Sequence, residues 1–113
     1  MNRVTEEIQS KANQISSLCE RYYVRRLELF GSAANGKFDP NTSDLDFLVE
    51  FGMVPVGKKF DSYFGLLESL ESMFNRKVDI VEARAIRNPY FLEFVQKNPR
   101  IVVYGSQDKS LFA

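Results

Sequence analysis

The sequence predicts an α+β domain, a small mixed β-sheet flanked by helices. Apolar residues recur every three or four positions over the first 22 residues, which is typical of an amphipathic helix. Further along, "LDFLVEF" has an apolar residue at every second position, which predicts a strand. Gly, Pro and Asn separate these segments, so the elements follow one another in the order α-β-β-α-β-α-β.

The length and composition fit one globular domain. The chain has 113 residues, of which 44% are apolar and 13% aromatic, enough to form a hydrophobic core. We expect a single domain over residues 1–104 and a flexible tail over residues 105–113.

Several classes of protein are disfavoured by the same totals. No apolar run approaches the roughly 18 residues of a membrane span, and no apolar signal segment opens the chain, so a cytoplasmic location is expected. Cys19 is the only cysteine and the chain has no histidine, which excludes an internal disulfide and argues against zinc. Fifteen basic and fifteen acidic residues give no net charge, which argues against free nucleic acid as the main partner.

The first half of the chain predicts one helix and two strands. The helix covers residues 3–22, followed by a turn at residues 23–26 and a first strand, "LELF". A glycine-containing loop with room for one helical turn leads to the second strand, "LDFLVEF". The apolar face of the helix contains these residues: Val4, Ile8, Ala12, Ile15, Leu18 and Tyr22.

The second half predicts two helices and two strands. A loop over residues 52–59 precedes a helix, and "KVDIVE" is the third strand. Asn88 and Pro89 suit the cap and first turn of a helix over "YFLEFVQK", and "RIVVYG" adds a short last strand. The expected apolar face of the middle helix contains these residues: Phe60, Tyr63, Phe64, Leu67, Leu70, Met73 and Phe74.

Acidic residues interrupt two of the apolar strands. Asp44 and Asp46 are two apart and therefore share one face of their strand, and Asp79 joins them if its strand pairs alongside. Two carboxylates about 4 Å apart repel by roughly 4 kcal/mol at an effective dielectric near 20. Magnesium would relieve that repulsion, because it binds a few carboxylates together with water and substrate phosphates. Unrelated acids on a solvated sheet face remain the alternative.

A Gly-Ser pair follows the first strand directly. Glycine at position 31 lets the backbone approach a phosphate, whose oxygens the amides and the Ser32 hydroxyl can bind. The pair lacks the spacing and lysine of a Walker loop, and a plain turn is the alternative reading.

The combination of these features resembles a known family. A strand, "GS", eleven residues, "DLD" within an apolar strand and a later "VDIV" are similar to the nucleotidyltransferase superfamily with the polymerase-beta-like fold. The short length resembles its minimal nucleotidyltransferase (MNT) members, commonly encoded beside HEPN-domain partners in toxin–antitoxin or two-subunit systems. The resemblance covers residues 27–81.

The resemblance implies roles for the three acids. Asp44 and Asp46 would ligate magnesium, and Asp79 would be a third carboxylate that binds the catalytic metal and helps to activate the acceptor hydroxyl. Two magnesium ions can stabilise both the attacking and the leaving oxygens of an in-line displacement at the α-phosphorus of ATP.

The resemblance also implies a triphosphate site, with one departure. Gly31 and Ser32 would bind the phosphates of the nucleoside triphosphate, and Ser43 would steady the turn that enters the second strand. Many minimal members read Gly-Ser-x-Ala-Arg-Gly, whereas Asn35 stands here in place of the arginine. Lys37 could supply part of the missing cation.

The leading hypothesis is therefore a magnesium-dependent adenylyltransferase antitoxin that transfers AMP from ATP to a hydroxyl of a HEPN-type partner. A binding module without useful turnover and the catalytic subunit of an aminoglycoside-type nucleotidyltransferase are the alternatives.

The surplus of aromatic residues suggests a surface that binds another subunit. The candidates are Phe60, Tyr63, Tyr90 and Phe91, and the alternative is that they belong to the ordinary core. The nucleobase, the acceptor and the oligomeric state, homomeric or heteromeric, stay open.

Overall fold

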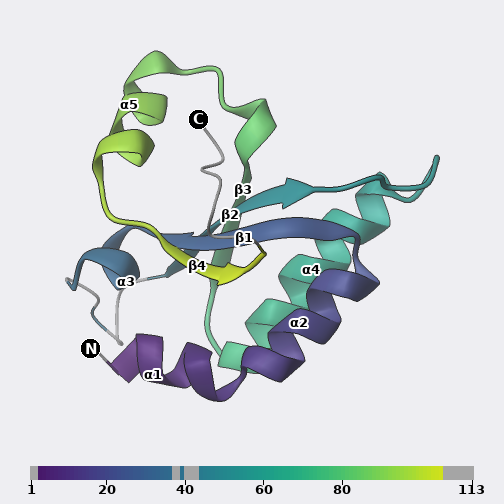
Figure 1. The fold of residues 1–113 in the computed structure, drawn as a ribbon, viewed down its shortest axis with the longest axis horizontal. Helices are drawn as coiled ribbons and strands as arrows, with labels where there is room; N and C mark the ends of the chain where they lie inside the picture. Colours follow the sequence, from purple (N-terminus) through teal and green to yellow (C-terminus); the bar gives the residue numbers. More distant parts are fainter. Residues whose placement is uncertain (1–2, 37–38, 40–43, 106–113) are drawn as a thin grey trace.

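The fold is built on a four-stranded mixed sheet (Figure 1). The computed structural model describes residues 3–36, 39 and 44–105. The strands are β1 (Val24–Phe30), β2 (Leu45–Phe51), β3 (Val78–Glu82) and β4 (Ile101–Tyr104). Their order is β3-β2-β1-β4; β1 runs antiparallel to β2 and β4, whereas β2 and β3 are parallel. The predicted α+β class with a mixed sheet is confirmed.

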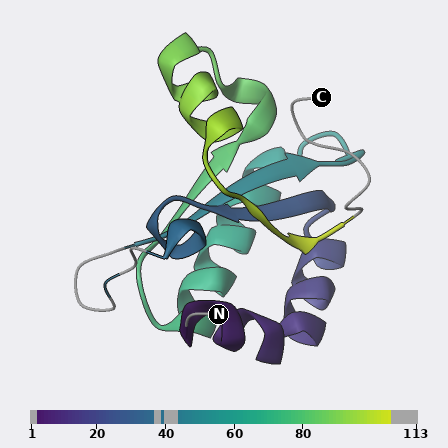
Figure 2. The same cartoon turned by 60° about the vertical axis from the view of Figure 1, so that its left-hand side comes forward.

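Helices cover the two faces of the sheet unequally. The helical elements are α1 (Arg3–Ser10), α2 (Ala12–Arg21), α3 (Ser32–Asn35), α4 (Lys59–Phe74), the 3₁₀ turn η1 (Ala83–Ala85) and α5 (Pro89–Lys97). Helices α2 and α4 lie side by side against one face, and the short α5 lies over the other (Figures 1 and 2). In the ranges described, no helix is long and apolar enough to cross a membrane.

The main core lies between the sheet and helices α2 and α4. Alternate residues of the central strands point into it, as the period-2 pattern predicts. Its fully buried members include Ile15, Cys19, Leu27, Leu29, Phe47, Val49, Leu66 and Leu70. Cys19 of α2 packs in this core as a buried free thiol.

The N-terminal helix is broken, which corrects the prediction of one helix over residues 3–22. The break falls at Lys11, whose backbone leaves the helical conformation between α1 and α2. The Lys11 ammonium donates to the carbonyl oxygen of Met73 at the end of α4, at 3.2 Å. The break is therefore accompanied by a contact with Met73, far away in the sequence, and the periodicity of a helix does not predict such contacts.

The expected turn at residues 23–26 is also corrected. The turn consists of Tyr22 and Tyr23, the latter with φ +64°, and β1 already begins at Val24. The strand is longer than "LELF" because Arg26 pairs with Glu50 of β2.

The buried face of α4 differs from the one predicted. Ser62 and Leu66 face the core, whereas Phe60 and Phe64 point to solvent. Small residues accompany this rotation: a Cβ atom on Gly65 would lie 2.3 Å from the ring of Tyr22, so the glycine leaves room for that ring beside α4. The sequence interpretation followed the large apolar residues and missed the small ones.

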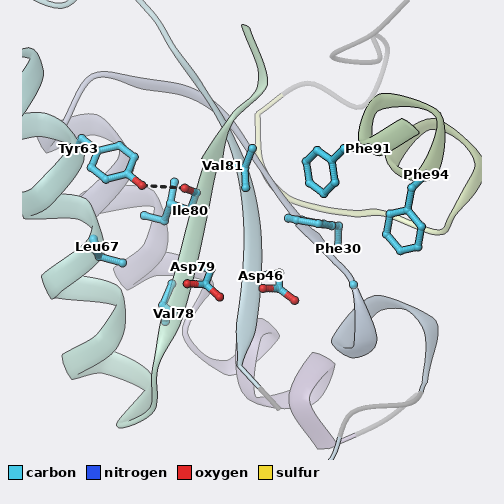
Figure 3. A pocket seen from close by; sticks show the side chains of 11 residues that line it. Phe30, Asp46, Tyr63, Leu67, Val78, Asp79, Ile80, Val81, Phe91 and Phe94 are labelled. Atoms are coloured by element: carbon cyan, nitrogen blue, oxygen red, sulfur yellow. Dashed lines mark hydrogen bonds between the residues drawn. The ribbon is translucent and has the colours of Figure 1, made fainter. Parts of the chain in front are cut away.

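A second, smaller core lies beneath α5. Phe30 and Leu48 point to this side of the sheet and pack against Val95. The predicted start of α5 is confirmed, since the Asn88 side chain accepts hydrogen bonds from the amides of Tyr90 and Phe91 at 2.9 and 3.3 Å. Helix α5 covers only part of the face, which leaves the end that carries the acids open to a cavity (Figure 3). The predicted tail lies almost wholly outside the described residues.

Candidate active site

Two carboxylates stand side by side on neighbouring strands. The parallel pairing of β2 with β3 places Asp46 directly opposite Asp79. Both side chains project from the sheet into one cavity (Figure 3). From the sequence, Asp79 was expected to lie beside Asp46 only if their two strands pair, and in the structure these strands do pair. Asp44 lies one residue before β2, with its carboxylate 3.9 Å from the ammonium of Lys77.

The electrostatics of this pair favour a bound cation. The pKa of Asp46 is raised from 3.8 to about 6, chiefly by burial and then by the negative charges of Asp79 and Asp44 and a hydrogen bond with the Asp79 side chain. At neutral pH, like charges are therefore held together in a partly desolvated place. A cation or a proton would relieve that repulsion.

Gly31 closes one end of this acidic pair. Its backbone has φ +72° and ψ −150°, a conformation open to glycine and strained for other residues. A Cβ atom here would lie only 2.6 Å from a carboxylate oxygen of Asp46. The Gly31 carbonyl accepts from the amides of Ala34 and Asn35 and so starts the single turn of α3, whose first residue is Ser32.

Aromatic and aliphatic side chains surround the acids. The cavity has a volume of about 510 Å³ and is lined by Phe30, Gly31, Asp46, Tyr63, Leu67, Val78, Asp79, Ile80, Val81, Phe91 and Phe94. Tyr63 extends from α4, and its hydroxyl donates to the carbonyl oxygen of Ile80 at 2.8 Å (Figure 3). Such walls reduce the local dielectric constant and strengthen electrostatic interactions within the cavity.

The donor set fits magnesium. Within the described ranges, no three acidic or cysteine side chains already stand close enough together to hold an ion. Magnesium does not require such a cage, because it commonly takes one or two carboxylates and completes its octahedron with water and substrate phosphates. Asp46 and Asp79, with Asp44 nearby, are hard oxygen donors of that kind.

The structure locates most, but not all, of the predicted site residues. It brings Gly31, Asp46 and Asp79 together and places Ser32 next to them in the chain. Lys37 and Ser43 lie outside the described residues, so their predicted roles remain predictions.

Sequence reasoning missed part of the site. It did not assign Phe30 or Phe94 to the walls of the acidic cavity, and it did not place Lys77 beside Asp44. Phe30 could have been found, since it directly precedes Gly31 in the same strand. Phe94 belongs to α5, and no local pattern in the sequence predicts where that helix lies over the sheet.

The four aromatic residues considered for a partner surface do not share one environment in the structure. Phe60 and Tyr90 are 70% and 82% exposed, as that hypothesis requires. Tyr63 and Phe91 are half-buried and line the cavity instead.

Comparisons with known sequences agree with this geometry. The chain matches the family described as "Nucleotidyltransferase domain" over residues 11–103. It is 34% identical over 93 residues to "Putative protein adenylyltransferase MJ1379" of Methanocaldococcus jannaschii, covering 82% of this chain and 89% of that protein. "Putative protein adenylyltransferase MJ0128" of the same organism is 37% identical over 81 residues, covering 72% and 79%.

Comparisons with solved structures give the same fold. "Structure of putative minimal nucleotidyltransferase" has a TM-score of 0.66 and 32% identity, covering 83% of this chain and 91% of that one. "Crystal structure of the toxin-antitoxin with AMP-PNP" has a TM-score of 0.62 and 23% identity, covering 85% and 74%. A complex of a tri-AMPylated Shewanella oneidensis HEPN toxin with an MNT antitoxin has a TM-score of 0.57 and 22% identity, covering 88% and 74%. At these identities the last two show a shared fold alone.

Proposed function

The chain belongs to the minimal nucleotidyltransferase family, and from this premise we propose that it is a magnesium-dependent protein adenylyltransferase that transfers AMP from ATP to a hydroxyl group of a HEPN-domain partner. One observation carries the proposal: Asp46 and Asp79 are paired on adjacent strands, with Gly31 against the carboxylate of Asp46. Carboxylates beside a close backbone approach suit a metal-bound triphosphate.

In this proposal each residue has a separate task. The backbone at Gly31 and the hydroxyl of Ser32 bind the phosphates that leave as pyrophosphate. Asp44 and Asp46, with Asp79, would hold the metal. Magnesium, when bound, stabilises the charge that develops on the attacking and leaving oxygens.

The transfer conserves atoms and charge in a simple way. A bond forms between the acceptor oxygen and the α-phosphorus of ATP while the bond from that phosphorus to pyrophosphate breaks. Asp79, on the edge strand of the sheet, orients the acceptor hydroxyl and takes up its proton. The apolar walls contributed by Phe30 and Phe91 limit competing attack by water.

The choice of acceptor draws on the relatives. Two curated relatives bear the name "Putative protein adenylyltransferase", and one structure with this fold contains a tri-AMPylated HEPN toxin in complex with an MNT antitoxin. The names support a protein acceptor, and the complex supports a HEPN partner for this chain.

A masking function without turnover is the second candidate, and Asn35 favours it. Asn35 stands at the end of α3, where many minimal members have an arginine that would neutralise triphosphate charge. The two functions differ in whether the bound partner is covalently modified.

The test is co-expression with a HEPN-domain partner, followed by intact-mass analysis of the purified partner after incubation with ATP and magnesium. We expect one AMP-sized increment per modified site, and none with the Asp46→Asn variant. A stable complex whose partner keeps its mass would support masking and contradict adenylylation.

A binding measurement tests the metal separately. Titration calorimetry should give a much higher ATP affinity with magnesium or manganese than in EDTA, and calcium should support binding with little turnover. Equal affinity for ATP with and without a divalent cation would contradict the proposed site.

A further inference from the structure

One pair of core residues places a lysine beside the acids of the site; this inference rests on the proposed function. Leu45 of β2 lies opposite Val78 of β3, and both are buried in the main core. The Leu45 amide donates to the carbonyl oxygen of Lys77 at 3.1 Å. The residues directly before this pair, Asp44 and Lys77, are therefore held at the same level of the two strands.

Lys77 belongs to the face of the sheet that carries the acids. Side chains alternate along extended chain, so residues two apart share a face. Asp44 therefore lies on the face of Asp46. Lys77 likewise lies on the face of Asp79. The Lys77 ammonium is 3.9 Å from a carboxylate oxygen of Asp44, which agrees with this placement. Three carboxylates and one ammonium thus occupy two successive rows of the sheet.

The proposed phosphate-binding segment begins at the same end of the sheet. Phe30, the last residue of β1, pairs with Asp46. Because β1 runs antiparallel to β2, Gly31 and helix α3 continue past this pair in the direction in which Lys77 lies. The Lys77 side chain is 70% exposed, and its flexible stem lets the ammonium exchange partners. An ammonium at this end can bind either a carboxylate or a phosphate.

The contact between Lys77 and Asp44 is one that a ligand can replace. An exposed ion pair of this length contributes little to stability. A divalent cation that binds Asp44 without a nucleotide comes close to the ammonium, and the two positive charges repel each other. A nucleoside triphosphate brings negative charge together with the cation and offers the ammonium a new partner. The same lysine therefore opposes the bare cation and favours the cation–nucleotide complex.

We propose that Lys77 is a positioning residue that couples the metal to the nucleotide. In the free chain its ammonium holds the Asp44 carboxylate and opposes the binding of a divalent cation alone. When a nucleoside triphosphate is present, the ammonium binds a phosphate oxygen and strengthens the binding of the cation–nucleotide complex. The metal then enters the site together with its nucleotide.

Two binding measurements on Lys77→Gln test this coupling without requiring turnover. Glutamine keeps a polar side chain but removes the charge. Binding of Mn²⁺, a substitute for Mg²⁺ at carboxylate sites, is followed by electron paramagnetic resonance in the absence of nucleotide. Binding of AMP-PNP in the presence of magnesium is followed by calorimetry. In Lys77→Gln we expect Mn²⁺ to bind about five-fold more tightly and AMP-PNP about five-fold more weakly. Lys77→Arg keeps the charge and should stay within about two-fold of the original chain in both measurements.

Lys97→Gln is the matched control. The Lys97 side chain is 72% exposed and also pairs with a carboxylate, that of Glu93 at 2.6 Å, but it belongs to α5. Its substitution should change neither affinity more than about two-fold, because an exposed charge outside the site is screened by solvent and salt. Circular dichroism checks that each variant is folded.

The outcomes separate this inference from the proposed function. If the original chain binds both ligands, the role of Lys77 is refuted when the two affinities of Lys77→Gln do not move in opposite directions, or when Lys97→Gln shows the same changes. An original chain that binds neither Mn²⁺ nor AMP-PNP would contradict the proposed function itself, and this inference with it.

Discussion

The two faces of the sheet are made by the same strands and yet are different environments. On the face toward α2 and α4, Leu29 and Phe47 are fully buried among aliphatic side chains. On the opposite face, their neighbours in the chain are Glu28 and Asp46. Because side chains alternate, the apolar face fixes the strand register, and a slip of one residue would exchange the two sets. The packed face therefore positions the acids of the other.

The opposite face itself holds its carboxylates in two ways. Glu28 is 2% exposed and lies 3.5 Å from both the Arg26 Nε and an Arg100 guanidinium nitrogen, so this chain supplies its counter-charges. Asp46 faces another carboxylate, Asp79. The ion pairs of Glu28 stabilise the fold, whereas the pair formed by Asp46 and Asp79 requires a cation from outside the chain. Substitutions at the two carboxylates should therefore have opposite consequences.

The largest expected effect is the loss of transfer in Asp46→Asn. Removing one carboxylate of the pair removes a metal ligand, so adenylyl transfer should fall by about 10³-fold or more, a barrier increase of roughly 4 kcal/mol. The fold should persist. Rates of pyrophosphate release measured at equal concentrations of folded protein check this, and a near-normal rate would contradict the assignment of the site.

Glu28→Gln should instead lower the stability of the fold and leave the rate of transfer almost unchanged. Removing the negative partner of a buried ion pair leaves the Arg26 and Arg100 charges uncompensated and should lower the free energy of unfolding by about 3 kcal/mol. Transfer per folded molecule should stay within about two-fold of the original. Urea denaturation measures the free energy of unfolding. A selective loss of transfer in a stable variant would assign Glu28 to the catalytic site instead.

Gly31→Ala should give an intermediate effect on transfer. The new Cβ atom would strain the backbone and displace the Asp46 carboxylate, which should reduce transfer about 30-fold, or roughly 2 kcal/mol of barrier. Gly57→Ala is the matched control, because Gly57 also has a positive φ, +82°, but a Cβ atom added there would meet no other atom within 4 Å. Gly31→Ala should lose more stability because of its clash, so transfer is compared per folded molecule, and only Gly31→Ala should lose transfer. Equal transfer in the two would show that Gly31 has no role in the site.

The contrast between the faces also explains what the sequence could predict. The apolar residues at every second position of "LDFLVEF" assigned Asp46 to the face opposite Phe47 and Val49, and "KVDIVE" did the same for Asp79. These are local properties of extended chain. The break at Lys11 and the rotation of α4 around Gly65 involve contacts between distant segments, and local patterns contain no record of them. The place of Tyr63 in the cavity wall follows from that rotation.

The smallest expected effect concerns the pH dependence of stability, and it comes from the titration of Asp46. The pKa of Asp46 is about 6 in the folded protein against 3.8 for an unperturbed aspartate. Between these values the folded state binds more protons than the unfolded state, so the free energy of unfolding decreases as pH rises through this window. The full shift corresponds to about 3 kcal/mol, and partial solvent exposure of the carboxylate reduces the expected loss to about 1 kcal/mol.

Asp46→Asn removes this titration and should therefore be more stable than the original chain at neutral pH and equally stable near pH 3.5, when no metal is present. Urea denaturation in EDTA at pH 3.5 and 7.5 measures the difference, which should grow by about 1 kcal/mol between the two. Magnesium with ATP at pH 7.5 should reverse the order, because only the original chain retains the full ligand set and gains the free energy of binding. A difference that stays constant between the two pH values would mean that burial and the neighbouring carboxylates do not raise the pKa of Asp46 in solution.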